Sequence, residues 1–285
     1  MNDGETFTPI KSGKYSFIVK RNIQRYNGTI INHTYMIGGD YTRCVNISYK
    51  YKNNNVVEAY IPHLLYEPEC AIHSTLERGD GVVQMIKAII QHAYKEVPSI
   101  TLFTFDDMSK IDCLPKDLSK PPERKVIKPV NLAYFSIIYN GKTWYELRFN
   151  AEMIDKDKYN KYRERLLFLT DPSQKPPFER FLEIAQPPLE QVDMLKLLYD
   201  DATTYREFFN AIPKNKRCDI LYSWLTTFMK YYIGDVYTET NWVIDVETMN
   251  RPSIGSGGGY TRKNSAKRRS PQKYRLYTYK DIQSL

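Results

Sequence analysis

The feature that most constrains this chain is a glycine-containing turn, Leu76 to Gly81, which runs directly into an amphipathic stretch ending at Tyr94. Apolar residues recur in that stretch at every third or fourth position, and this spacing predicts a helix with one buried stripe. The stripe consists of Val82, Ile86, Ile89, Ile90 and Ala93. The first amides of a helix have no partner inside it, and glycine lets a ligand approach the backbone closely. Such a helix start is typical of an anion site.

A strand and a second helix are expected after this helix. Pro98 interrupts the helical pattern, and the apolar run 100–105 is typical of a short buried strand. Asn131 can cap a second helix that extends to Ala151, although the apolar run 132–138 is also compatible with a strand. Further upstream, alternating residues in 45–51 and 56–61 predict a hairpin. This order of turn, helix and strand predicts an α/β protein.

The order of these segments resembles the acetyl-CoA-binding core of the GCN5-related N-acetyltransferase (GNAT) family. Residues 78–81 resemble its pyrophosphate-binding turn, and residues 140–151, which include Tyr145, resemble its second-helix motif. The chain departs from the family pattern at Val83, where a small residue is usual, and at Arg148, where glycine is common. The resemblance spans about half of the chain. The sequence also resembles uncharacterised proteins of the nucleocytoplasmic large DNA viruses.

The resemblance implies a fold, a cofactor and a set of site residues. The fold would be a GNAT-like mixed, mostly antiparallel sheet flanked by helices, with acetyl-CoA as cofactor and an amine as acetyl acceptor. Tyr145 would protonate the leaving thiolate, with Tyr139 as an alternative acid, and Glu77 would be the base, with Glu58 and Asp107 as alternatives. The expected cofactor-binding residues are Arg78, Gly79, Asp80, Gly81, Val82, Asn140 and Lys142.

Each of these residues also has a purely structural interpretation. A glycine turn can simply precede a helix, and a carboxylate beside a phosphate is repulsive, although Asp80 also suits a helix N-terminus. Single carboxylates and aromatic residues are common at surfaces and in cores. The alternative hypothesis is therefore a non-catalytic viral structural or nucleic-acid-associated protein that retains the fold.

The charge of the chain is concentrated near its C-terminus. The formal net charge is +8, and a segment without acidic residues supplies all of it. Its cations are Arg251, Arg262, Lys263, Lys267, Arg268, Arg269, Lys273 and Arg275. We expect a disordered basic tail whose residues 260–275 bind nucleic acid or an acidic partner, with a nuclear-targeting signal and a solvated tail as alternatives.

Four divisions of the chain are predicted from its composition and its proline breaks. They are an N-terminal segment (1–30), the acetyltransferase-like domain (31–170), a C-terminal helical module (171–250) and the basic tail (251–285). The acceptor amine and the oligomeric state do not follow from the sequence.

Cysteine, histidine and hydropathy patterns bear on metals and on the compartment. The four cysteines, Cys44, Cys70, Cys113 and Cys218, lie far apart in the sequence, which favours reduced, mostly buried thiols. The histidines show no ligand spacing, so no metal is expected. No stretch approaches the roughly 20 apolar residues of a membrane helix. We therefore expect a cytoplasmic protein, in the host cytoplasm or the virion if viral, with the nucleus as an alternative.

Overall fold

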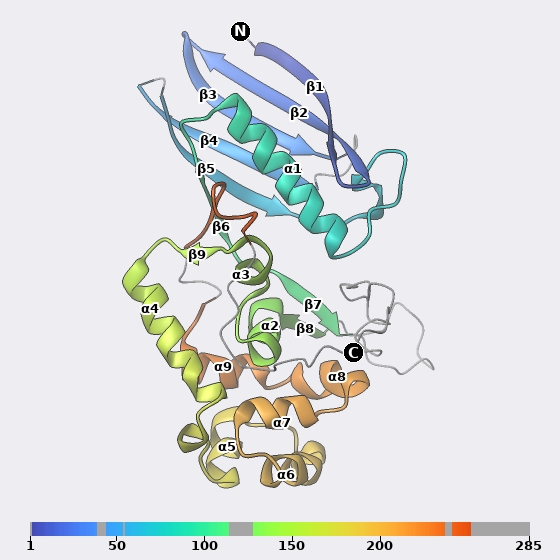
Figure 1. Cartoon of the computed structure of the whole chain (residues 1–285), viewed down its shortest axis with the longest axis vertical. Coiled ribbons are helices and arrows are strands. Elements are labelled where there is room, and N and C mark those ends of the chain that lie inside the picture. Colours follow the sequence, from blue (N-terminus) through green and yellow to red (C-terminus); the bar gives the residue numbers. More distant parts are fainter. Residues whose placement is uncertain (1, 39–43, 54, 114–127, 237–240, 252–285) are drawn as a thin grey trace, which may run out of the picture. The chain divides into compact units, whose positions relative to one another are not determined.

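The computed structural model describes residues 2–38, 44–53, 55–113, 128–236 and 241–251 (Figure 1). Clustering of contacts divides the chain into two compact units. Within the described residues, unit 1 covers positions between 2 and 103, 148–150 and 244–251, and unit 2 covers positions between 104 and 147 and between 151 and 243.

The sheet of unit 1 is an antiparallel meander of strands joined by short turns. Its strands are β1 (Asn2–Ser12), β2 (Tyr15–Tyr26), β3 (Thr29–Ile37), β4 (Val45–Lys52) and β5 (Asn55–Leu64). Asn27 and Gly28 between β2 and β3 both have positive φ, as a tight two-residue hairpin turn requires. The pairing of β4 with β5, in which Tyr49 lies opposite Ala59, confirms the predicted hairpin.

Helix α1 (Asp80–Glu96) lies across one face of this sheet (Figure 1). The side chains of a strand alternate between faces, and the buried positions of β2, β3 and β4 form the face under the helix. Phe17, Val19, Tyr35 and Ile47 are fully buried there. All five residues of the predicted helical stripe are also buried, so the periodicity that predicted α1 is confirmed.

A disulfide joins Cys44 to Cys70 in unit 1, so the prediction of reduced thiols was wrong. Cys44 directly precedes β4, and Cys70 ends the 3-10 helix η1 (Pro68–Cys70). The Leu65 amide donates to the Cys44 carbonyl at 2.7 Å, which returns the chain to the start of β4 and leaves the two Cα atoms 5.9 Å apart. Cys218 is disulfide-bonded as well. Because Cys44 and Cys70 are 26 residues apart in the sequence, their spacing did not indicate that the two side chains meet.

Unit 2 begins within β6 (Leu102–Asp106), the predicted strand after α1. Across the described residues the sheet has the order β1-β2-β3-β4-β5-β6-β10-β9, and β7 pairs with β8 separately. The bounds of these strands are β7 (Lys110–Cys113), β8 (Lys128–Asn131), β9 (Glu152–Met153) and β10 (Asn241–Asp245). The mixed α/β class with a large, mostly antiparallel sheet is thereby confirmed.

The predicted second helix is divided into α2 (Leu132–Asn140) and α3 (Trp144–Phe149). The Asn131 side chain accepts from the Tyr134 amide at 3.3 Å, which confirms the predicted N-cap. Gly141 then adopts the left-handed conformation with φ 71°, which ends α2 as glycine commonly does. The helix predicted as continuous is thus interrupted because this glycine follows Asn140.

The remaining helices of unit 2 share an aromatic core. Their bounds are α4 (Lys156–Arg165), α5 (Phe178–Ala185), α6 (Val192–Asp200), α7 (Tyr205–Ala211), α8 (Arg217–Leu221) and α9 (Leu225–Ile233). Short 3-10 helices connect them at Leu166–Leu169, Pro172–Gln174, Leu189–Gln191 and Lys214–Lys216. Phe181 and Phe228 both lie in the centre, each contacting several other rings.

The helices after residue 170 do not form a unit of their own. Helix α2 contacts α7 and α9, and α4 contacts α9, so these elements belong to one core. The predicted N-terminal segment, residues 1–30, contains β1 and β2 of the unit 1 sheet. The predicted divisions at residues 30 and 170 therefore differ from the two units, because packing joins segments that composition separates. The tail prediction concerns residues outside the described ranges.

Candidate functional site

The start of α1 combines a glycine cap with free helical amides. Gly79 is the N-cap with φ 82° and ψ −103°, a conformation in which a side chain would be strained. No side chain caps this helix end. The first helical hydrogen bond runs from the Val83 amide to the Gly79 carbonyl at 2.9 Å, so the amides of residues 80–82 precede it and have no acceptor within the helix. Such amides bind anions at helix N-termini.

Gly81, in contrast, is explained by packing. A Cβ atom at this position would lie 3.0 Å from Leu76 Cδ1 and 3.3 Å from the Tyr15 hydroxyl oxygen. Leu76 is completely buried and has little freedom to move away. The neighbouring Val82 is buried as well, so its side chain belongs to the core.

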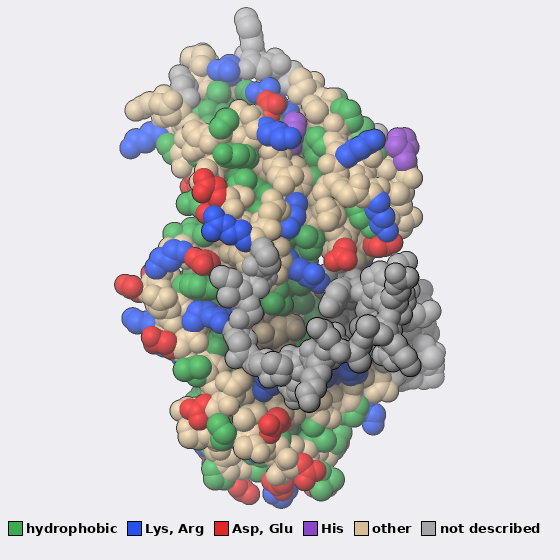
Figure 2. Space-filling model, in the orientation of Figure 1, with side chains coloured by type: hydrophobic (Ala, Val, Ile, Leu, Met, Phe, Trp, Pro, Cys, Tyr) green, Lys and Arg blue, Asp and Glu red, His purple; other side chains and the backbone are tan. Residues whose placement is uncertain are grey.

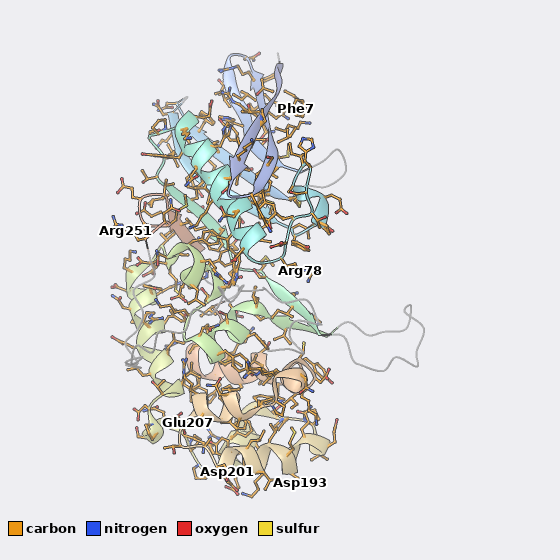
Figure 3. The ribbon with its side chains drawn as sticks, turned by 45° about the vertical axis from the view of Figure 1, so that its right-hand side comes forward. Phe7, Arg78, Asp193, Asp201, Glu207 and Arg251 are labelled. Atoms are coloured by element: carbon orange, nitrogen blue, oxygen red, sulfur yellow. A yellow bond between two sulfur atoms is a disulfide. The ribbon has the colours of Figure 1, made fainter. Side chains whose placement is uncertain are left out.

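Two arginines of unit 1 lie near the start of α1. The guanidinium of Arg78, labelled in Figure 3, is 4.7 Å from the centre of the Tyr66 ring. Arg148 Nη1 is 3.8 Å from Asp80 Oδ1, so the first carboxylate of the helix has a cationic partner. In the resemblance to the family, Arg148 stands where glycine is common, and the sequence did not indicate its contact with Asp80.

Glu77, the predicted base, is an exposed member of an ion pair. Its Oε1 accepts from Lys14 Nζ at 2.6 Å, and its side chain is 62% exposed. The hydrogen bond to Glu77 raises the pKa of Lys14. The alternative Glu58 forms a similar surface pair with Lys50 at 2.8 Å.

Tyr145, the predicted acid, lies in the core of unit 2. It is 6% exposed, its hydroxyl is 3.3 Å from Ser109 Oγ, and its ring centre is 4.5 Å from that of Phe105. Burial, together with the negative charge of Asp107, raises the pKa of Tyr145. The hydroxyl therefore keeps its proton at neutral pH.

Asp107 is the most unusual ionisable group beside Tyr145. It is 1% exposed, and burial raises its pKa to about 6 from 3.8. The Ser109 amide donates to Oδ1 at 3.2 Å, whereas Oδ2 has no hydrogen-bond partner among the described residues. Asp107, Ser109 and Tyr145 thus form a buried polar cluster that sequence reasoning did not assemble, since 36 residues separate Ser109 from Tyr145.

Glu146, next to Tyr145, is fully engaged. Its carboxylate accepts from the Thr143 amide at 2.7 Å and from the Tyr159 and Tyr162 hydroxyls at 3.0 and 2.8 Å. Arg163 adds an ion pair at 3.4 Å. A buried carboxylate with this many donors is satisfied, so Glu146 attaches α3 to α4.

The last predicted cofactor-binding residues lie at the end of α2. Asn140 is exposed and its Nδ2 is 3.5 Å from Ser136 Oγ, which in turn donates to the Lys142 carbonyl at 2.8 Å. Tyr139, the alternative acid, has a raised pKa because of its burial, and Arg217 lies 3.9 Å from its ring centre. These contacts stabilise the turn at Gly141.

The predicted residues therefore fall into two groups. Residues 77–82 belong to unit 1, whereas Asn140, Lys142 and Tyr145 belong to unit 2. Within each unit the structure brings together neighbours that the sequence did not indicate, namely Arg148 with Asp80 and Ser109 with Tyr145.

No family model, curated protein or solved structure matches this chain. The resemblance to the GNAT family consequently stays a prediction, and function has to be argued from the geometry. Among the described residues, no group of three or more His, Cys, Asp or Glu side chains could hold a metal ion. None of the described helices combines the length and apolar character needed to cross a bilayer.

Proposed function

We propose that this protein binds acetyl-CoA through the start of α1 and is an N-acetyltransferase-like protein. The observation that carries the proposal is the uncapped helix start behind Gly79, in a helix that connects the neighbouring strands β5 and β6. Helix starts between adjacent strands of α/β sheets are common binding positions for diphosphates.

The charges near this helix start support an anionic ligand. Arg78 contributes a guanidinium group, and Arg148 offsets the repulsion that Asp80 would otherwise exert on a phosphate. A diphosphate would accept hydrogen bonds from the first-turn amides, while the arginine adds a charge-assisted contact. This combination favours the diphosphate of coenzyme A over a neutral ligand.

The proposed reaction transfers the acetyl group to an amine. The amine nitrogen forms a bond to the thioester carbonyl carbon, the carbon–sulfur bond breaks, and the thiolate leaves. A carboxylate accepts the amine proton, and a general acid protonates the leaving thiolate. Glu77, which belongs to the same unit as the start of α1, stays the proposed base. Tyr145 and Asp107 belong to unit 2, and their roles as acid and alternative base stay predictions from the family resemblance.

Thermal unfolding with acetyl-CoA, coenzyme A and pantetheine tests the binding step. We expect the first two to stabilise the full chain, by about 2.7 kcal/mol at 100 times Kd, and pantetheine, which lacks the diphosphate, to have no effect. Arg78→Gln should weaken the stabilisation, whereas Lys50→Gln, an equal charge change on the same unit, should not. Absence of any acetyl-CoA effect on the wild type would remove the proposal.

The second candidate is a non-catalytic protein that retains the α/β fold. Two observations favour it: Gly81 is required for packing against Leu76, and Glu77 is paired with Lys14. Each explains part of the motif without a ligand. Wild-type protein that binds acetyl-CoA yet transfers no acetyl group to a panel of primary amines would support this candidate.

A further inference from the structure

A cavity of about 190 Å³ lies in unit 2, outside the residues assigned above. One side of it is formed by α4 through Lys158, Lys161, Tyr162 and Arg165, and the other side by residues 233–236 at the end of α9. The α4 residues are spaced three or four positions apart, which places them on one face of the helix. The Tyr162 hydroxyl donates to Glu146 at 2.8 Å, which fixes this face.

Lys158, Lys161 and Arg165 form a cationic face on α4, and Asp235 is a carboxylate that lines the same cavity. Within the described residues, no carboxylate forms an ion pair with any of the three. Asp235, the carboxylate that lines the cavity, pairs instead with Lys230 at 2.5 Å. Figure 2 shows basic and acidic side chains side by side over α4.

The three cations of this face are exposed, and a bound anion would offset their mutual repulsion. Like charges on successive turns of a helix repel each other. Lys158 is also in the first turn of α4, where the helix dipole disfavours a positive charge. Lys156 in the same turn differs, because it has an ion-pair partner in Glu152. Arg165 alone is explained by the dipole, since it ends the helix.

The inner wall of the cavity is apolar. Met153, Ile233 and Val236 are buried and form an apolar floor. Gly234 has φ 80°, and a Cβ atom there would lie 3.4 Å from Arg165 Nη1. That distance is an ordinary van der Waals contact, so the glycine is explained by its positive φ at the end of α9.

We propose that this cavity binds a small phosphorylated ligand. The cationic face would hold the phosphate, because its three cations attract the two negative charges of that group. Arg165 could donate hydrogen bonds to two phosphate oxygens. The apolar floor would contact a compact hydrophobic part of the ligand. An apolar protein cavity of about 150 Å³ accommodates benzene, so this cavity of about 190 Å³ has room for one small ring.

Titration calorimetry on the full chain, with phenyl phosphate, inorganic phosphate and phenol as probes, tests this proposal. Phenyl phosphate should bind about tenfold more tightly than inorganic phosphate, because only its ring buries apolar surface, and phenol should not bind detectably. Equal binding of phenyl phosphate and inorganic phosphate would overturn the proposal, since the site would then recognise only an ion.

Variants separate the cationic face from general charge. The double variant Lys158→Gln/Lys161→Gln should weaken phenyl phosphate binding at least about tenfold. Lys156→Gln, the same change on the same helix, should leave it unaltered, and acetyl-CoA binding should not respond to either. Unchanged phenyl phosphate binding in the double variant would overturn the assignment.

A measurement on the wild type avoids dependence on variants. Phenyl phosphate should give nuclear Overhauser contacts between its ring protons and the Met153 methyl group, which belongs to the apolar floor. Absence of these contacts at saturation would place the ligand elsewhere. If a short single-stranded oligonucleotide bound through Lys158 and Lys161 and phenyl phosphate did not, the site would be assigned to nucleic acid instead.

Discussion

Single residues of this protein are informative where burial conflicts with charge. Glu146 and Asp107 are both buried carboxylates in unit 2, and only Glu146 is saturated with donors. Asp107 keeps one oxygen without a hydrogen-bond partner among the described residues. A buried polar atom without a partner costs free energy, so its retention favours a function beyond stability.

Asp107→Asn should stabilise the protein at pH 7. The folded-state pKa of Asp107, about 6, is above the ordinary 3.8, so folding favours the protonated carboxyl. Its contribution to stability is fully present below pH 3.8 and is lost as the pH rises through 6. The amide cannot ionise, so we expect a gain of about 2 to 3 kcal/mol in the free energy of unfolding.

Urea denaturation of wild type and Asp107→Asn at pH 7 and at pH 4 measures this effect. The difference should shrink at pH 4, where Asp107 is largely protonated in the folded protein. Asp106→Asn, at the exposed neighbouring position, provides the control and should change stability by less than about 0.5 kcal/mol. Equal stabilities of wild type and Asp107→Asn at pH 7 would contradict the assigned burial cost.

Two helices, α1 and α4, carry the candidate binding sites of this protein. Helix α1 starts at a glycine N-cap, and the disulfide between Cys44 and Cys70 attaches the segment between β5 and α1 to the start of β4. That bond closes a loop with a sequence separation of 26 residues, which includes both β4 and β5. Helix α4 supplies the cationic face through Lys158, Lys161 and Arg165, which lie on one side of this short helix.

Replacing Cys44 and Cys70 together by alanine should lower the free energy of unfolding by about 3 kcal/mol, because the unfolded chain regains the freedom of that loop. Guanidinium denaturation under non-reducing conditions, in which the disulfide of Cys218 stays intact, isolates the effect. A double variant as stable as the wild type would show that the bond contributes little. Dithiothreitol added to wild type alone would not be decisive, since it also reduces the second disulfide.

The whole chain combines a formally neutral body with a basic C-terminal segment. Residues 260–275, which lie outside the described ranges, carry most of the excess positive charge. We keep the proposal that this segment binds nucleic acid or an acidic partner. Contacts between lysine or arginine and phosphates release counterions, so affinity should fall as salt rises.

Removing the residues after Gly255 tests this at the scale of the molecule. Retention of single-stranded DNA by the full chain should fall steeply between 50 and 200 mM salt, by roughly 300-fold for six contacts, and the shortened chain should lose most of the low-salt affinity. Fluorescence anisotropy at several salt concentrations measures both quantities. Salt-insensitive binding that survives the deletion would exclude the tail as the binding segment.

Local features of the fold were predictable because they depend on neighbours in the sequence. The stripe of α1, the β4–β5 hairpin and the Asn131 cap each follow from a short periodicity or a single side-chain bond. The candidate site was only partly predictable. Gly79 and Arg78 lie at the helix start as expected, whereas Arg148 reaches Asp80 from a segment 68 positions later.

The sequence by itself determined the α/β class, the position and buried face of α1, and the location of the excess charge. Only the tertiary structure decided the Cys44–Cys70 bond, the cluster around Asp107, and the cavity beside α4. The physical reason is that the periodicities of helices and strands depend on residues close together in the sequence. Contacts between distant residues depend instead on how every element packs, which no local pattern contains.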